Sequence, residues 1–167
     1  MHNKDIFKAL SELDYPQIKL FSGGNMKKTP ILDIRIEANG APLHFQGSTA
    51  EIDIIPFKGT VDCDLFHGIV EPFGVDTQIV NAVHVRHMSA RYVLTGRDAE
   101  GNDCHIYVEN NGWFDDLHKT MPFHTIPTFY TDSPALADIL HKCTYTGEGT
   151  ELEDGLHIRF YPIGEDE

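Results

Sequence analysis

The chain has few cysteines, little positive charge and no long hydrophobic run. Its three cysteines, Cys63, Cys104 and Cys143, are widely spaced and form no CxxC pair, which argues against a disulfide framework or a structural zinc site. Lys and Arg total 13 against 26 Asp and Glu, a formal net charge of -13, and such a surface repels nucleic-acid phosphates and anionic membranes. No segment is apolar enough to span a bilayer, and residues 1–16 lack the apolar centre of a signal peptide. We therefore expect free thiols in a cytoplasmic protein, with no nucleic-acid or membrane partner.

The chain divides into one folded domain and two short extensions. Ile6, Leu10 and Leu13 recur at near-helical spacing until Pro16 ends the pattern, which predicts a short N-terminal helix. Residues 21–30 are rich in Gly, Asn and Pro, which is typical of a loop. We therefore assign residues 1–29 to an N-terminal extension of helix and loop, residues 30–163 to a single β-barrel domain, and residues 164–167 to an acidic tail.

Most of the domain has the composition of β-strands bounded by Gly, Pro, Asn or Asp. Strands are expected at residues 31–37, 51–57, 65–70, 77–86, 90–95, 104–110, 123–131 and 155–162. One helix is expected late in the chain, where Ser133 suits the N-cap and Pro134 the first helical position. Many short strands with one or two short helices predict a mainly β protein, an antiparallel, lipocalin-like β-barrel, whose closure removes exposed strand edges.

Two of these strands, at residues 90–95 and 104–110, are joined by a segment containing Gly101 and Asn102, which predicts a β-hairpin. The preferred register places apolar side chains on one face: Ala90, Tyr92, Leu94, Cys104, Ile106 and Val108. The other face then carries Arg91, Val93, Thr95, His105, Tyr107, Glu109 and Asn111. We expect this polar face to turn toward an enclosed cavity. The alternative is a solvent face with an ordinary cross-strand ion pair.

The candidate catalytic residues are Asp76, Arg91 and Glu109. A partly desolvated carboxylate can act as a general base or acid, and a guanidinium can stabilise developing negative charge. We expect the ligand to be bound by His67, Gln78, His105, Tyr107, Asn111 and Phe123. The alternative is that Asp76 and Arg91 form a structural pair that only fixes strand register.

We expect neither a metal nor a cofactor. His84 and His87 lie three residues apart, so a strand would send them to opposite faces. His105 and Glu109 share a face, but four strand steps put them roughly 13 Å apart. The chain has no phosphate-binding glycine loop with a lysine and no nucleophile elbow.

Four blocks of this sequence, in order, resemble the DUF3237 family of small β-barrel proteins. The matching positions are Gly68, Val70, Gly74 and Asp76; Ala90, Arg91, Tyr92 and Leu94; Asp98, Gly101, Ile106, Asn110 and Gly112; and Phe123, Thr125, Pro127, Phe129 and Thr131. The family pattern is altered at Phe73, Thr77, Ser89, His124 and Tyr130. The resemblance covers residues 31–163 and implies a β-barrel and a homo-oligomer, a dimer or larger, without implying a particular reaction.

These observations favour a barrel that binds a small molecule. The first hypothesis is a cofactor-free enzyme that catalyses proton transfer, such as isomerisation, cyclisation or elimination, on a small carbonyl metabolite. The second is a non-catalytic carrier of an apolar metabolite. The third is an accessory subunit of a larger enzyme, with the N-terminal helix as the contact.

Overall fold

The computed structural model describes residues 29–142 and 145–163, which form nine β-strands and one short helix. The elements are β1 (Leu32–Ala38), β2 (Leu43–Gln46), β3 (Ala50–Cys63), β4 (Phe66–Asn81), β5 (Val85–Asp98), β6 (Asp103–Asp115), β7 (Phe123–Thr131), α2 (Pro134–Leu140), β8 (Tyr145–Leu152) and β9 (Gly155–Pro162). The predicted N-terminal helix and acidic tail lie outside the described residues. Within the described ranges, no helix is long and apolar enough to cross a membrane.

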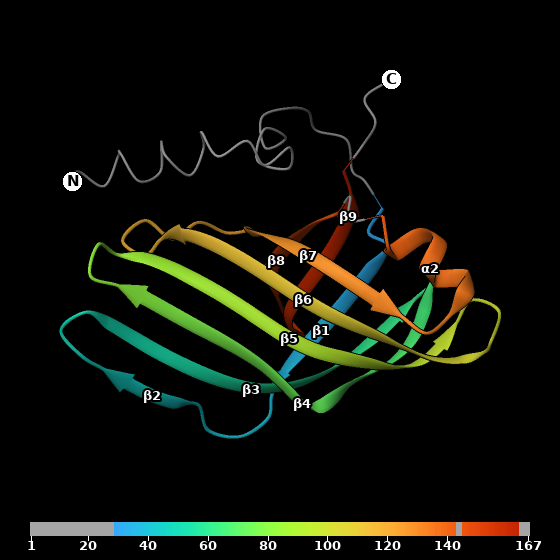
Figure 1. The fold of residues 1–167 in the computed structure, drawn as a ribbon, viewed down its shortest axis with the longest axis horizontal. Coiled ribbons are helices and arrows are strands. Elements are labelled where there is room, and N and C mark those ends of the chain that lie inside the picture. The colour runs from blue at the N-terminus through green and yellow to red at the C-terminus, as the bar shows by residue number, and fades with distance from the viewer. Residues whose placement is uncertain (1–28, 143–144, 164–167) are drawn as a thin grey trace.

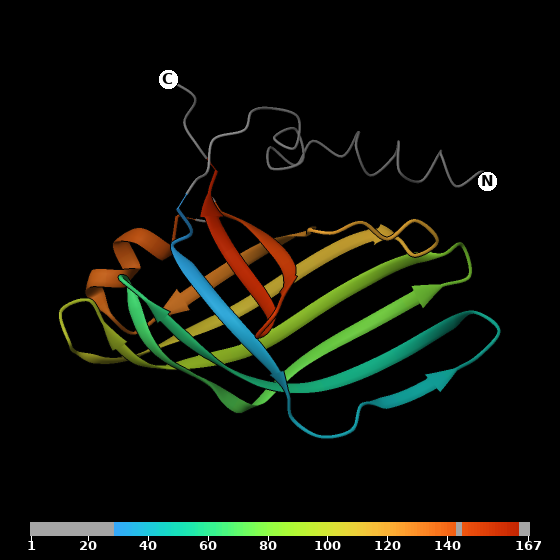
Figure 2. The same cartoon turned by 180° about the vertical axis from the view of Figure 1, so that it is seen from behind.

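Eight of the strands close into an antiparallel barrel. Neighbours follow the order β1-β9-β8-β7-β6-β5-β4-β3, and a further pairing of β1 with β3 completes the ring, while β2 adds to the free edge of β3. The strands β1, β8 and β9 cross behind the long strands β3 to β6 in Figure 1 and lie in front of them in the view from behind (Figure 2). The predicted mainly β, antiparallel barrel is confirmed.

The strand β3 changes partner along its length. Its first half, Glu51–Ile54, pairs with β2, whereas Phe57–Val61 pairs with β1. The wall is therefore closed by β1 only over the second half of β3. Along the first half of β3, the strands β3 to β6 extend past the closed ring and form an open sheet with β2 (Figure 1). We call this part, residues 43–56, 75–81, 85–91 and 109–115, the flared sheet.

The opposite end of the barrel is covered by α2. Ser133 caps this helix, because its side chain accepts a hydrogen bond from the backbone N–H of Leu136. Leu136 and Leu140 are buried and join the core that the apolar faces of the strands form. The N-cap prediction is confirmed, and one end of the barrel is a packed apolar plug.

The central hairpin has the predicted register. Val93 pairs with Tyr107 and Leu94 pairs with Ile106, so the two side-chain faces are the ones expected. Both arms are longer than expected, and Gly101 takes the positive φ (84°) that the turn requires. The buried face is the apolar one.

The predicted strand 65–70 and the first part of the predicted strand 77–86 belong to one strand, β4, which bulges between Val70 and Val75. This strand ends at Asn81, whose side-chain oxygen accepts hydrogen bonds from the N–H groups of Val83 and Val85. The predicted strand 77–86 is therefore divided by a turn, and residues 85 and 86 begin β5. Sequence patterns missed β2 because it has only four residues, and β8 because Gly147 and Gly149 interrupt it.

Candidate functional site

A cavity of about 130 Å³ lies inside the barrel, where the packed core meets the flared sheet. A void of about 150 Å³ can hold benzene, so this one accommodates a group the size of a small ring. Its lining combines apolar and polar side chains from β1, β3 to β7 and β9: Ile36, Phe57, Asp76, Gln78, Met88, Ala90, Tyr92, Asn110, Phe123, Thr125, Leu156 and Ile158.

Asp76 is the acidic residue of this lining. It pairs with Ala90, which pairs with Asn110, and directly paired residues project from the same face of a sheet. Its Oδ2 accepts a hydrogen bond from Gln78 Nε2 (2.7 Å), whereas its Oδ1 is buried without a partner. Burial raises the pKa of the Asp76 carboxyl, and the hydrogen bond from Gln78 opposes this shift. One carboxylate oxygen is thus held in place and the other is available.

A chain of hydrogen bonds orients Gln78. Arg86 donates from Nη1 to Gln78 Oε1 (2.7 Å) and from Nε to Asp116 Oδ1 (2.6 Å). Because Arg86 can only donate, Gln78 must present its carbonyl oxygen to Arg86 and its amide N–H to Asp76. The hydrogen-bonded series Asp116, Arg86, Gln78 and Asp76 therefore positions the Asp76 carboxylate. The Arg86 guanidinium is linked to this carboxylate through the side chain of Gln78.

Three further polar groups of the lining have buried atoms without partners: the hydroxyl of Tyr92, Oδ1 of Asn110 and Oγ1 of Thr125. Burial raises the pKa of the Tyr92 hydroxyl, and the nearby negative charge of Asp76 raises it further, so this group stays protonated and can donate a hydrogen bond. Of the five buried side-chain atoms without a partner in the described residues, four belong to this cavity. Buried polar groups are normally paired, so this concentration makes the cavity the candidate site of the protein.

The polar face of the central hairpin lies on the outside of the barrel, so the expectation that it lines an enclosed cavity is wrong. The Arg91 side chain is 64% exposed and its Nε lies 3.3 Å from Glu109 Oε1, which also accepts a hydrogen bond from the Tyr107 hydroxyl (2.8 Å). An eight-stranded barrel has an interior just wide enough for its side chains, and desolvating an ion pair is costly. The apolar face of the hairpin therefore occupies the interior, and Asp76 is separated from Arg91 and Glu109 by the barrel wall.

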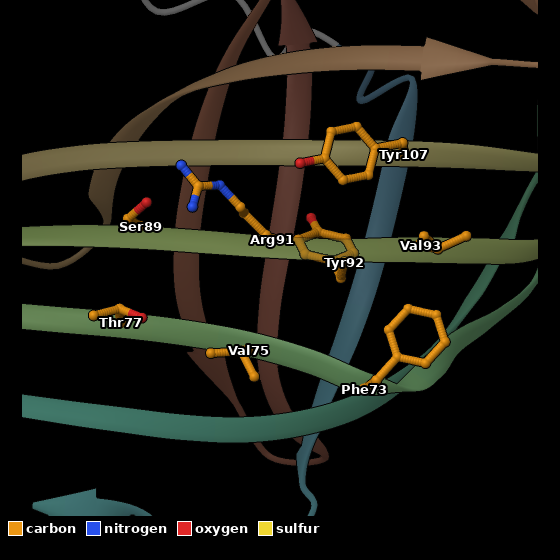
Figure 3. A pocket seen from close by; sticks show the side chains of 8 residues that line it. All are labelled: Phe73, Val75, Thr77, Ser89, Arg91, Tyr92, Val93 and Tyr107. Atoms are coloured by element: carbon orange, nitrogen blue, oxygen red, sulfur yellow. The ribbon is translucent and has the colours of Figure 1, made fainter.

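A second hollow of about 370 Å³, the outer groove, lies on that outer wall (Figure 3). Its labelled lining comes from β4, β5 and β6: Phe73, Val75, Thr77, Ser89, Arg91, Tyr92, Val93 and Tyr107. It lies over the bulge where the β4–β5 pairing is interrupted between Val70 and Val75. Tyr92 is the one residue that lines both this groove and the inner cavity.

The predicted site residues are thus divided between several places. Asp76, Gln78 and Phe123 line the inner cavity, whereas Arg91 and Tyr107 line the outer groove with Glu109 beside them. His67 and His105 are exposed and contact Asp62 and Asp132, and Asn111 contacts His87 on the outer face. The roles assigned to these residues stay predictions.

Sequence reasoning missed Tyr92, Asn110 and Thr125. Tyr92 resembled an ordinary core residue of the apolar face. Asn110, however, continues the alternation of Ile106 and Val108 and is buried like them. A polar residue at an apolar position of a strand pattern was the signal that could have identified it.

Comparison with known proteins gives consistent results. Residues 26–163 match the family described as "Protein of unknown function (DUF3237)". The UPF0311 protein of Clostridium acetobutylicum is 30% identical over 130 residues, which cover 66% of this chain and 76% of that protein. A crystal structure of a protein of unknown function from Clostridium acetobutylicum is 29% identical, with a TM-score of 0.65, and covers 83% of this chain and all of that one. An enzyme from Penicillium herquei has a TM-score of 0.53 at 13% identity, covering 86% of this chain and all of that one.

Proposed function

The chain belongs to the DUF3237 family, and from that premise we propose that its inner cavity binds a small carbonyl metabolite and catalyses a proton transfer without a cofactor. The observation that carries this proposal is the buried, unpartnered Oδ1 of Asp76 in a cavity of ring-like size. The enzyme from Penicillium herquei has a similar fold, which supports the proposal that such a barrel can be an enzyme.

Asp76 has the properties of a general base or acid. Desolvation raises the pKa of its carboxyl above the ordinary value of 3.8, which makes the carboxylate a stronger base. Gln78 holds the second oxygen, so the free Oδ1 has a fixed direction in the cavity. In this mechanism, Oδ1 removes a proton next to the substrate carbonyl and returns it elsewhere on the substrate or to the leaving group.

The developing enolate needs a hydrogen-bond donor, and Tyr92 is suited to this role. Its hydroxyl is buried, protonated and without a partner, so a substrate oxygen meets no competing acceptor there. The side chain of Asn110 offers a second polar contact from the neighbouring strand. Arg91 and Glu109 take no part in this step, because they lie on the outer wall.

The lining also limits the substrate. Phe123, Leu156 and Ile158 provide apolar contacts, and the carboxylate of Asp76 disfavours an anion within the same small volume. The substrate is therefore an uncharged molecule whose reacting part is about one ring in size.

The test is to incubate a neutral fraction of a cell metabolite extract with the protein and follow it by chromatography coupled to mass spectrometry. The wild-type protein should deplete one carbonyl compound and form an isomer or elimination product. Asp76→Asn should lower this rate by about 10²–10⁴-fold, the usual contribution of general acid–base catalysis. The control Glu109→Gln changes an acidic residue outside the cavity and should retain the activity. Equal rates for wild type and Asp76→Asn would refute the mechanism.

A carrier function is the second candidate, because most residues of the cavity lining are apolar. Native mass spectrometry of the freshly purified protein distinguishes the two. An intact metabolite that stays bound, with no compound converted in the extract, would favour the carrier.

A further inference from the structure

A cluster of three side chains with metal-ligand chemistry lies on the flared sheet, at the β2–β3 pairing. His44 pairs directly with Asp53, and Glu51 lies two residues before Asp53 on the same face of β3. His44 Nδ1 is 2.8 Å from Asp53 Oδ1, and one potential ligand atom from each of the three residues lies within 4.8 Å of the other two.

We propose that His44, Glu51 and Asp53 bind a divalent transition-metal ion, with Zn²⁺ preferred over Mg²⁺. In the tetrahedral geometry that Zn²⁺ prefers, two ligand atoms with bonds of about 2.1 Å are about 3.4 Å apart. His44 Nδ1 and Asp53 Oδ1 are hydrogen-bonded at 2.8 Å, so the metal replaces this hydrogen bond and the two atoms separate slightly. The ligand atom of Glu51 lies within 4.8 Å of both and moves inward to complete the site. An imidazole with two carboxylates suits Zn²⁺, whereas Mg²⁺ prefers oxygen ligands alone.

The third ligand distinguishes this cluster from the other histidine–aspartate pairs on the surface. Comparable pairs form between His67 and Asp62, His105 and Asp132, and His118 and Asp115. In the part of the chain that the structure describes, only the His44 pair has a third potential ligand atom within 4.8 Å of both partners. His157 also contacts two aspartates, Asp33 and Asp154, but through different ring nitrogens. Two carboxylates beside one imidazole leave a local negative charge that a divalent cation neutralises.

The position of the cluster supports a role near the inner cavity. Asp53 pairs with Gln78 across β3 and β4, so His44, Asp53 and Gln78 form one row on the same face of the flared sheet. Gln78 belongs to the cavity lining. Three protein ligands leave coordination positions open for water or for a ligand, as in catalytic rather than structural metal sites. The proposal concerns binding of the metal itself and does not rest on the proposed proton transfer.

Isothermal titration calorimetry with zinc chloride tests the site, with tag-free, full-length protein that has been treated with a chelator and desalted. The wild-type protein should bind one Zn²⁺ saturably, and magnesium chloride should give no saturable binding. His44→Ala should weaken Zn²⁺ binding by at least tenfold, since even the loss of groups that only support ligands costs about 10–100-fold. Asp53→Asn and Glu51→Gln should weaken it as well.

The matched control is His105→Ala, which removes a histidine from a pair of the same length, 2.8 Å, that lacks a third ligand. It should bind Zn²⁺ like the wild type. Circular dichroism of each variant verifies the fold. We expect unchanged spectra, because these side chains are partly exposed. No saturable Zn²⁺ binding, equal binding of Mg²⁺, or unchanged Zn²⁺ binding by His44→Ala would each overturn the proposal.

Discussion

Replacing Asp76 by Asn should stabilise the protein at neutral pH, and the gain should depend on pH in a defined direction. Burial raises the pKa of the Asp76 carboxyl above its ordinary value of 3.8, so the folded state favours the protonated form. The contribution of this group to stability is therefore fully present below pH 3.8 and is lost as the pH rises through the folded-state pKa. Asn does not titrate, so the variant should escape this loss.

The size of the gain follows from burial of the negative charge. An unsatisfied buried polar group costs about 1–3 kcal/mol, and more when it is charged. The Asp76 carboxylate has Oδ1 buried without a partner, and Asn puts an uncharged amide in its place. The side-chain oxygen of Asn can still accept the hydrogen bond from Gln78 Nε2, so that contact is kept. We expect Asp76→Asn to be more stable than the wild type by about 1–3 kcal/mol at pH 7, where each kcal/mol corresponds to about 2–4 °C in Tm. Near pH 4 the difference should fall toward zero.

Urea unfolding followed by circular dichroism at several pH values between 4 and 8 measures this difference. The control is Asp64→Asn, an exposed aspartate between β3 and β4, which should change the free energy of unfolding by less than about 0.5 kcal/mol. A variant Asp76→Asn that is less stable than the wild type at pH 7 would refute the reasoning. An equal advantage at pH 4 and pH 8 would also refute it, because burial of the charged form would then not be the cause.

Three further predictions concern single side chains. Tyr92→Phe removes a buried hydroxyl without a partner, so Tm should stay equal or rise while turnover in the metabolite assay falls. Ser133→Ala removes the N-cap of α2 and the hydrogen bond from Ser133 to Asp98 Oδ2, and should cost about 1 kcal/mol or more in urea unfolding. Gly96→Ala would place a Cβ in steric conflict with the carbonyl oxygen of His67 and should destabilise the barrel by about 1–3 kcal/mol. Its control, Gly47→Ala, meets no atom within 4 Å and should be neutral.

Local patterns in the sequence were sufficient for most of the wall of the barrel, although they missed β8. The period-two alternation of the central hairpin determined its register, because only one pairing separates apolar from polar side chains. The capping residue Ser133 and the following Pro134 likewise located α2. Each of these features depends on residues close together in the sequence.

The location of the site was harder to predict, because it depends on long-range geometry. The strand β4 bulges between Val70 and Val75, just before Asp76, and no local pattern places such a bulge. The residues that orient Gln78, the hydrogen-bond partner of Asp76, come from other elements, since Arg86 lies on β5 and Asp116 follows β6. A concentration of charge on one face of the hairpin suggested the site instead, although charged faces of strands are usually solvated.

The two ends of the barrel differ in a way that relates the fold to its proposed chemistry. At the end covered by α2, the interior is apolar and packed, as Leu136, Leu140 and Phe160 show. At the other end, β3 leaves β1 for β2 and the sheet opens. Polar residues such as Gln78 and Asp53 can project from the inner face there without complete desolvation, which a closed interior would not allow. The change of partner in β3 is therefore the structural reason that the Asp76 network and the His44 cluster lie at the same end. Variants of either group should therefore affect ligand or metal binding more than the stability of the core.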